Sequence, residues 1–191
     1  DRLVHSPVVS LKIEGRMKSA EYVATVVSTY RKALDALAGS TTPVQDAEMR
    51  NLALAFNRGF TKGYLFCEKC NCATEHLSRN YNDAGLGRTW PDNHGLLIGT
   101  VTGCPSSGEV TVRLMIPMEL APGDGLVFRD PGQEGEELGF SLNTVPRHRG
   151  KTIILTSPVT VTPGTLVFLT SSTALKAHAH RIMASPPAAL R

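Results

Sequence analysis

The sequence has no hydrophobic run long enough to cross a membrane. Its apolar stretches, such as residues 96–98 and 166–169, fall far short of the about 20 residues that a transmembrane helix requires. The net charge is also small. The 20 Lys and Arg against 17 Asp and Glu give only +3, which is too little to indicate nucleic-acid binding by itself. No Gly-x-Ser-x-Gly elbow, His-Glu-x-x-His helix or phosphate-binding loop occurs. These absences disfavour a membrane protein and several common enzyme classes.

What is present is the composition of a globular protein. Of the 191 residues, 41% are hydrophobic, which disfavours disorder, and the length suits one sizeable domain or two small ones. The sequence starts at Asp1, without an initiating methionine, signal peptide or transit peptide. We therefore expect a piece of a longer protein.

The first half of the sequence has a helical hydrophobic period. The short apolar segment 8–14 predicts a buried strand. Ser19 is placed to cap a following helix that ends at Gly39, and Thr42-Pro43 predicts the start of a second helix. The first helix carries one apolar stripe, made of Tyr22, Val23, Val26, Val27, Tyr30, Leu34 and Leu37.

From about residue 95 the pattern is typical of β-structure. Short segments alternate between apolar and polar residues and are separated by Pro-Gly turns, which predicts a small barrel of six strands. A final helix is expected at 174–184, and the tail 185–191 is expected to fray. The fold class predicted is α+β. The expected strands are 97–101, 109–115, 125–129, 138–145, 152–155 and 165–169.

Three segments together resemble peptidase family U32. They are Ser-Leu-Lys-Ile-Glu-Gly-Arg-Met-Lys-Ser at 10–19, Phe-Asn-Arg-Gly-Phe-Thr-Lys-Gly-Tyr-Leu at 56–65 and Arg-Thr-Trp-Pro-Asp-Asn-His-Gly at 88–95. Their order and spacing are consistent over nearly the whole chain. The resemblance implies the terminal strand and helices of a (βα)8 barrel, followed by a small β-barrel similar to domain 2 of elongation factor Tu.

The resemblance also implies a division of the chain. Residues 1–66 would be the end of the (βα)8 domain, 67–94 a linker, 95–184 the C-terminal β-barrel and 185–191 a frayed tail. The remainder of the catalytic barrel, an N-terminal part of the same protein, is then an implied partner.

Members of this family were named collagenase-like peptidases, and better-understood relatives hydroxylate RNA bases with an iron–sulfur cluster. The cluster-binding cysteines of the family lie upstream of the segment that corresponds to 10–19, so this chain alone is expected to be inactive and to hold no cofactor. The resemblance favours a part of an RNA-hydroxylating enzyme, with rRNA or tRNA as partner. A collagenase-like protease and a non-catalytic module that binds RNA or a protein remain alternatives.

An ionisable cluster lies where the predicted strand 8–14 meets the first helix. Alternation along a strand puts Lys12 and Glu14 on one face, and Arg16 and Lys18 follow near a helix N-terminus that suits an anion. Glu14 and Arg16 are the candidate catalytic residues, with Lys12 and Lys18 as substrate-binding candidates. The alternative is an internal ion-pair network that closes the barrel.

A second polar cluster occupies residues 57–63. Gly59 and Gly63 permit a tight turn that exposes Arg58 and Lys62, which could contact RNA phosphates or an anionic substrate. The alternative is a helix-exit turn in which Phe60 fills a domain interface.

The cysteines are concentrated in one segment. Cys67, Cys70 and Cys72, with His76, could supply four zinc ligands, although strong zinc motifs pair two separated couples of ligands. The alternative is reduced thiols in a cytoplasmic protein, and a disulfide or an iron–sulfur role also stays open.

The most compact basic cluster is the predicted turn Arg147-His-Arg-Gly-Lys151. Arg147, Arg149 and Lys151 place three fixed positive charges in five residues and could contact RNA phosphates. The alternative is a solvated hairpin without a ligand.

Overall fold

The computed structural model describes residues 5–57, 60, 93–105, 108–131 and 137–185. Within them the chain forms an α+β fold, which confirms the predicted class. The helices are α1 (Ala20–Leu37), α2 (Asp46–Ala55) and α3 (Thr173–Ala184). The strands are β1 (Leu96–Gly103), β2 (Glu109–Leu114), β3 (Gly125–Arg129), β4 (Glu137–Ser141), β5 (Arg147–Arg149), β6 (Thr152–Thr156) and β7 (Leu166–Ser171).

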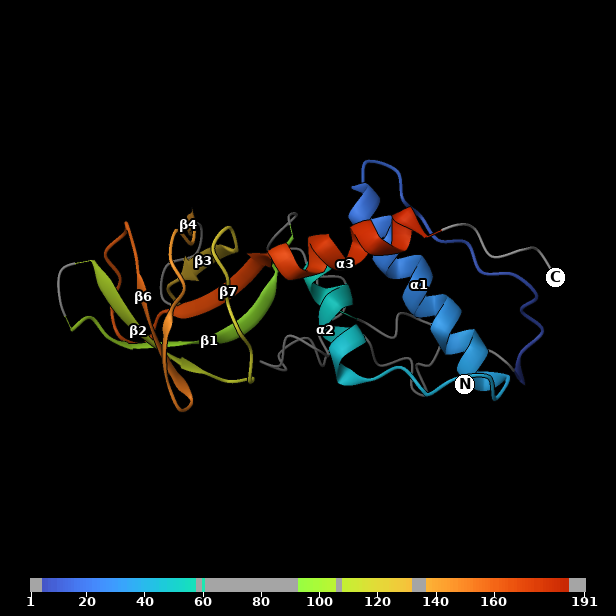
Figure 1. Cartoon of the computed structure of the whole chain (residues 1–191), viewed down its shortest axis with the longest axis horizontal. Coiled ribbons are helices and arrows are strands. Elements are labelled where there is room, and N and C mark those ends of the chain that lie inside the picture. The colour runs from blue at the N-terminus through green and yellow to red at the C-terminus, as the bar shows by residue number, and fades with distance from the viewer. Residues whose placement is uncertain (1–4, 58–59, 61–92, 106–107, 132–136, 186–191) are drawn as a thin grey trace, which may run out of the picture.

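The strands form one antiparallel sheet in the order β4-β3-β7-β1-β2-β6-β5. Its inward side chains come from both halves of the sheet, and Leu126 of β3 and Ile153 of β6 are both fully buried. Among the described residues, helix α2 packs on β1 and β7, and the sheet curls so that its own inward side chains cover one another (Figure 1). Figure 1 shows the curled strands at one end of the molecule and the helices at the other. This arrangement is consistent with the predicted β-barrel domain.

Alternation of apolar and polar residues explains which face is inward. In β2, Val110, Val112 and Leu114 are buried, whereas Arg113 is exposed. Burying such valine and leucine side chains stabilises the fold by about 1.5–3 kcal/mol each.

Strands form at all six predicted places, with two corrections. The segment 138–145 forms a strand only as far as Ser141. A seventh strand, β5, forms at Arg147–Arg149, where the sequence predicted a turn. It forms because the backbone of this segment pairs with the neighbouring β6 across the turn, and its sequence Arg-His-Arg contains no apolar residue to mark a strand.

The first helix begins as predicted, because the Ser19 hydroxyl accepts a hydrogen bond from the Tyr22 amide at 3.2 Å. The second helix begins later than predicted, at Asp46 instead of just after Thr42-Pro43. Its N-cap is Gln45, whose backbone amide donates to the Glu48 carboxylate at 2.8 Å. This capping interaction explains the shift.

The predicted buried strand at 8–14 is wrong for this structure. The segment forms no strand, and Val9 is 99% exposed. A strand requires a neighbour for its backbone hydrogen bonds, and within the described residues no other strand pairs with this segment.

Helix α1 packs against α2 and α3 through its small side chains. Ala24, Thr25 and Thr29 are buried there, and small residues allow neighbouring helices to approach closely. Most of the apolar stripe faces outward instead. Its exposed members, each 38–46% accessible, are Val23, Val27, Tyr30, Leu34 and Leu37.

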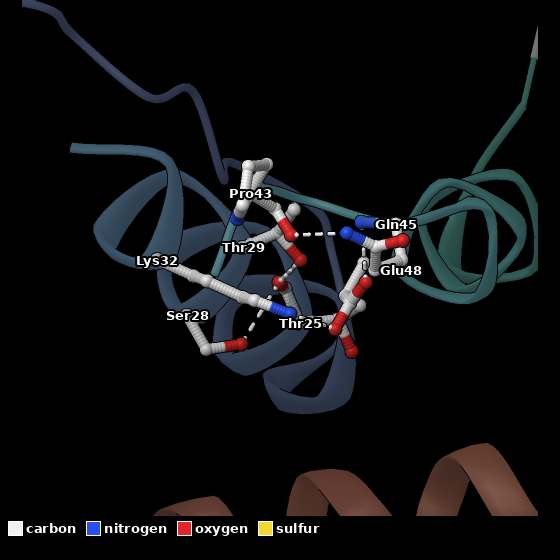
Figure 2. A network of polar contacts seen from close by, with 7 residues as sticks. All are labelled: Thr25, Ser28, Thr29, Lys32, Pro43, Gln45 and Glu48. Carbon is white, nitrogen blue, oxygen red and sulfur yellow. Dashed lines mark hydrogen bonds and ion pairs between the residues drawn. The ribbon is translucent and has the colours of Figure 1, made fainter. Parts of the chain in front are cut away.

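Polar contacts fix the helices to one another and to the sheet. Figure 2 shows Lys32 of α1 reaching Glu48 at the start of α2, with which it forms an ion pair. At the start of α3, the buried Asp124 carboxylate accepts hydrogen bonds from the amide and the hydroxyl of Thr173, at 2.7 and 2.9 Å. Through α3 the sheet is therefore joined to α1, whereas the predicted division into domains stays a prediction.

Candidate nucleic-acid interface

The basic hairpin predicted at 147–151 is made by β5, the turn that follows it and the start of β6. Arg147, Arg149 and Lys151 are all exposed. Arg147 forms an ion pair with Glu109 of β2, across the width of β6. Arg149 and Lys151 form no ion pair with any described residue. Arg149 and Lys151 are therefore the charges most available to an anionic ligand.

The register of the strands separates these three cations. Arg149 lies opposite Thr152, which in turn lies opposite Arg113 of β2, so Arg113 and Arg149 share the outer face about 10 Å apart. Arg147 lies opposite Ile154, on that same face. Lys151 stands apart from this row, in the turn. We call Arg113, Arg147 and Arg149 the outer basic face.

Arg113 was not among the candidate residues from the sequence. Its alternation with Val112 and Leu114 predicts that it points outward, but only the β2-β6-β5 pairing brings it beside Arg149. Because the strand order depends on long-range contacts, the sequence carried no direct signal for this neighbourhood.

A groove of about 790 Å³ lies on the other side of the hairpin. Its backbone frame is held by the Leu114 amide, which donates to the Lys151 carbonyl at 2.8 Å. His148 lies opposite the inward Ile153 and so lines this side of the sheet. The groove is lined by residues 114–120, Val145, His148, Gly150 and Lys151.

The ionisable cluster at the start of the chain is exposed rather than enclosed. The Lys12 ammonium lies 3.2 Å from the Glu14 carboxylate, and the Arg16 amide donates to Glu14 at 3.2 Å. The Arg16 amide, followed by Lys12, lowers the pKa of Glu14. The structure thus brings three of the four predicted residues together, in a surface turn.

The fourth residue, Lys18, contacts an aromatic pair instead. Its ammonium lies 3.1 Å from the centre of the Phe56 ring, and Tyr22 meets that ring edge-on at 6.2 Å between centroids. The Tyr22 hydroxyl also donates to the Glu14 carbonyl at 3.4 Å. These contacts tie the turn to the end of α2. The catalytic and substrate-binding roles of Lys12, Glu14, Arg16 and Lys18 stay predictions.

Several predicted site residues lie outside the described part of the chain. They are Arg58, Lys62, Cys67, Cys70, Cys72 and His76. Phe60 is described and is 44% exposed.

Within the described residues, no group of three or more His, Cys, Asp or Glu side chains is placed to hold a metal ion. The one cysteine there, Cys104, is exposed, and its thiol lies 3.3 Å from the Val161 carbonyl oxygen. This part of the chain therefore does not fit the iron–sulfur cluster that the resemblance implies. It also contains no helix with the length and apolar character needed to span a membrane.

The fold and the site define an α+β protein in which a curled antiparallel sheet presents a basic hairpin. Comparison with known proteins adds a family match. Residues 1–75 match peptidase family U32. The predicted resemblance is thus confirmed.

Three relatives show how far the likeness extends. The chain is 28% identical over 151 residues to "tRNA hydroxylation protein P" of Escherichia coli K12, a match that covers 79% of this chain and 30% of that protein. It is 63% identical over 35 residues to "tRNA hydroxylation protein P1" of Bacillus subtilis 168, or 18% of this chain and 8% of that protein. It is 29% identical over 154 residues to a "Collagenase" of Porphyromonas gingivalis, or 77% of this chain and 40% of that protein.

The matched region therefore spans less than half the length of each of these relatives. No solved structure matches the chain.

Proposed function

We propose that this chain is the C-terminal part of a longer U32-family enzyme that hydroxylates tRNA, and that its sheet contacts the RNA. The observation that carries the proposal is the family match at residues 1–75, together with relatives named as tRNA hydroxylation proteins. The outer basic face supports the second half of the proposal, because Arg113 and Arg149 offer charges for phosphate groups.

The exposed stripe of α1 supports the place of this chain in a larger fold. Val27, Tyr30 and Leu34 lie on one side of the helix at spacings of three and four, and each is more than 40% exposed. Such a face is normally buried. In the proposed enzyme, α1 is the last helix of a (βα)8 barrel, and this face packs against barrel strands supplied by the rest of the protein.

The chemistry is then divided between two parts of one enzyme. The iron–sulfur cluster implied by the family resemblance belongs to the upstream barrel, and the turn at Lys12 to Lys18 contributes charged groups to its rim. In this proposal Glu14 and Arg16 face the reaction, while Arg58 and Lys62 assist in binding an anionic substrate. The sheet, which would be similar to domain 2 of elongation factor Tu, delivers the tRNA. The enzyme is proposed to act in the cytoplasm.

A collagenase-like protease is the second candidate. It is favoured by one observation, the 29% identity with the Porphyromonas gingivalis collagenase over 77% of this chain. A non-catalytic module that binds RNA or protein is the third, and it shares the outer basic face with the first.

The test is a deletion of the gene that encodes this chain, followed by mass spectrometry of the nucleosides in bulk tRNA. We expect a hydroxylated nucleoside to disappear and to return when the gene is restored. Unchanged tRNA hydroxylation would contradict the proposal. Digestion of native collagen by the purified product of the whole gene, absent from an Arg16→Ala variant, would favour the protease.

A further inference from the structure

We propose that the groove beside the hairpin binds one unpaired nucleotide of the RNA, with its base between apolar side chains and its phosphate at Lys151. The proposal rests on the proposed function, because it assigns a second contact to the same RNA. It differs from the outer basic face, which lies on the opposite side of the hairpin.

The walls of the groove suit a flat, largely apolar group. Met115 and Val145 are 58% and 66% exposed, and Ile116 and Met118, which also line the groove, are partly buried against the core. A base that leaves its stack is held in proteins by apolar or aromatic side chains above and below it. The volume of about 790 Å³ lies within the range of pockets that hold small ligands.

The charge at the rim selects an anion. Lys151 lines the groove without an ion pair among the described residues, and His148 lines it as well. One acidic side chain, Glu119, also lines the groove. Lysine binds phosphate as a point charge. Apolar walls with a cation at the edge match a nucleotide better than an uncharged apolar peptide.

The two surfaces can act on one strand of RNA. Arg149 and Lys151 are separated by a single residue, Gly150, whose φ of +62° turns the chain between them. A backbone that passes over this turn meets Arg149 on one side and Lys151 on the other. Single strands are preferred in this arrangement, because the bases of a duplex are paired and stacked and cannot enter the groove.

The experiment measures binding of the 191-residue chain to a fluorescent ten-nucleotide RNA without secondary structure, and to the same strand in a duplex. Lys151→Ala removes the rim charge, and Met115→Glu places a carboxylate in the groove. Met115→Gln is the uncharged control for the second variant. Lys176→Ala/Arg181→Ala removes two exposed cations from α3 as the matched control for charge. Circular dichroism establishes that each variant is folded.

We expect Lys151→Ala and Met115→Glu each to weaken binding to the single strand by about tenfold, as the loss of one good contact does. The α3 variant should stay within about twofold of the parent, a change of under 0.5 kcal/mol on the same scale, and Met115→Gln should weaken binding less than Met115→Glu does. The slope of the logarithm of the binding constant against the logarithm of the salt concentration should become shallower by about 0.7 in Lys151→Ala. One phosphate of a single strand contributes a slope of this size.

Three outcomes would overturn the proposal. Equal weakening by the α3 variant would mean binding through general charge alone. Equal affinity for the duplex would exclude an inserted base. If Met115→Glu left RNA binding intact but dissociated a dimer in sedimentation, a second copy of the chain would occupy the groove.

Two results would distinguish a failure of this proposal from a failure of the proposed function. Loss of a hydroxylated tRNA nucleoside on gene deletion, together with normal hydroxylation in cells carrying Met115→Glu, would reject the groove and keep the enzyme. Selective single-strand binding without any change in tRNA hydroxylation on deletion would keep the groove and reject the enzyme.

Discussion

The side-chain oxygen of Asn93 accepts a hydrogen bond from the backbone amide of Asn57 at 2.8 Å and from that of Gly95 at 3.2 Å. The Asn57 side-chain amide donates to the Gly95 carbonyl at 3.1 Å, and the His94 backbone amide donates to the Asn57 carbonyl at 2.7 Å. The end of α2 is thereby fastened to the start of β1. Asn57 and Asn93 come from two of the three motifs that carry the family resemblance, so these motifs meet in space.

Asn93→Ala should destabilise the chain by about 2 kcal/mol, because it leaves two partly buried amides without their acceptor. Asn93→Asp keeps an oxygen at that position and should recover most of the loss. Asn143→Ala, at an exposed asparagine in the sheet domain, is the control and should change stability by less than about 0.5 kcal/mol. Urea unfolding measures all three. Equal stabilities of Asn93→Ala and Asn143→Ala would contradict the role of this contact.

Gly95→Ala should be more damaging. Gly95 has a φ of +69°, and an added Cβ would lie 2.5 Å from the Leu169 carbonyl oxygen, a backbone atom that cannot move aside. Strained backbone and steric overlap together predict a loss of about 2 kcal/mol or more. Gly39→Ala, also at positive φ but in open space, separates the two causes. A thermal midpoint for Gly95→Ala as high as that for Gly39→Ala would show that the overlap is relieved.

Thr25→Val should stabilise the chain or leave it unchanged. Thr25 is 2% exposed. Its hydroxyl has no hydrogen-bond partner among the residues that the structure describes, whereas its carbonyl accepts from Ser28 and Thr29 (Figure 2). Valine has nearly the same shape and lacks the hydroxyl. Removing this unsatisfied buried group should stabilise the fold by about 1 kcal/mol. Thr29→Val, which removes a hydroxyl that does have a partner at 2.8 Å, should instead destabilise. A lower unfolding midpoint for Thr25→Val than for Thr29→Val would refute this interpretation.

The Lys32–Glu48 ion pair should make stability depend on pH. The hydrogen bond from Lys32, followed by that from the Gln45 amide, lowers the pKa of Glu48 below its usual 4.5. A lowered carboxyl pKa means that the contribution is fully present above pH 4.5 and is lost as the pH falls through the folded-state value. Glu48→Gln should cost about 1 kcal/mol near neutrality, and the difference from the parent should shrink in acid.

Lys32→Gln is the partner control, since it removes the main cause of the shift. Urea unfolding at several pH values between neutrality and acid compares the variants. If the difference in free energy of unfolding between Glu48→Gln and the parent stayed constant below pH 4.5, the link between stability and Glu48 protonation would be ruled out.

Local signals in the sequence predicted much of this fold. Ser19 gave the start of α1, and the alternation of Val110, Val112 and Leu114 gave the inward face of β2, because capping and alternation act over a few residues. Features that depend on strand pairing were missed. The three residues of β5 form a strand because the neighbouring β6 pairs with them, although Arg-His-Arg has no apolar residue. Within the described residues, 8–14 stays unpaired although its composition favours a strand.

The site was predictable to the same extent. The charges at Arg147, Arg149 and Lys151 were visible as a cluster, but the register that places Arg113 beside Arg149 was not. Nor was the groove, whose walls come from segments 25 residues or more apart. The meeting of Asn57 with Asn93 likewise depends on how the helices sit on the sheet.

The measurement that tests the central claim most directly is the hydroxylated fraction of tRNA in cells whose only copy of the gene carries Arg113→Ala/Arg149→Ala. Cells with Lys176→Ala/Arg181→Ala provide the matched control, and immunoblots establish equal protein levels. We predict that hydroxylation falls several-fold in the first strain and stays normal in the second. Normal hydroxylation in both strains, or an equal loss in both, would contradict the claim that this sheet presents RNA to a U32-family enzyme.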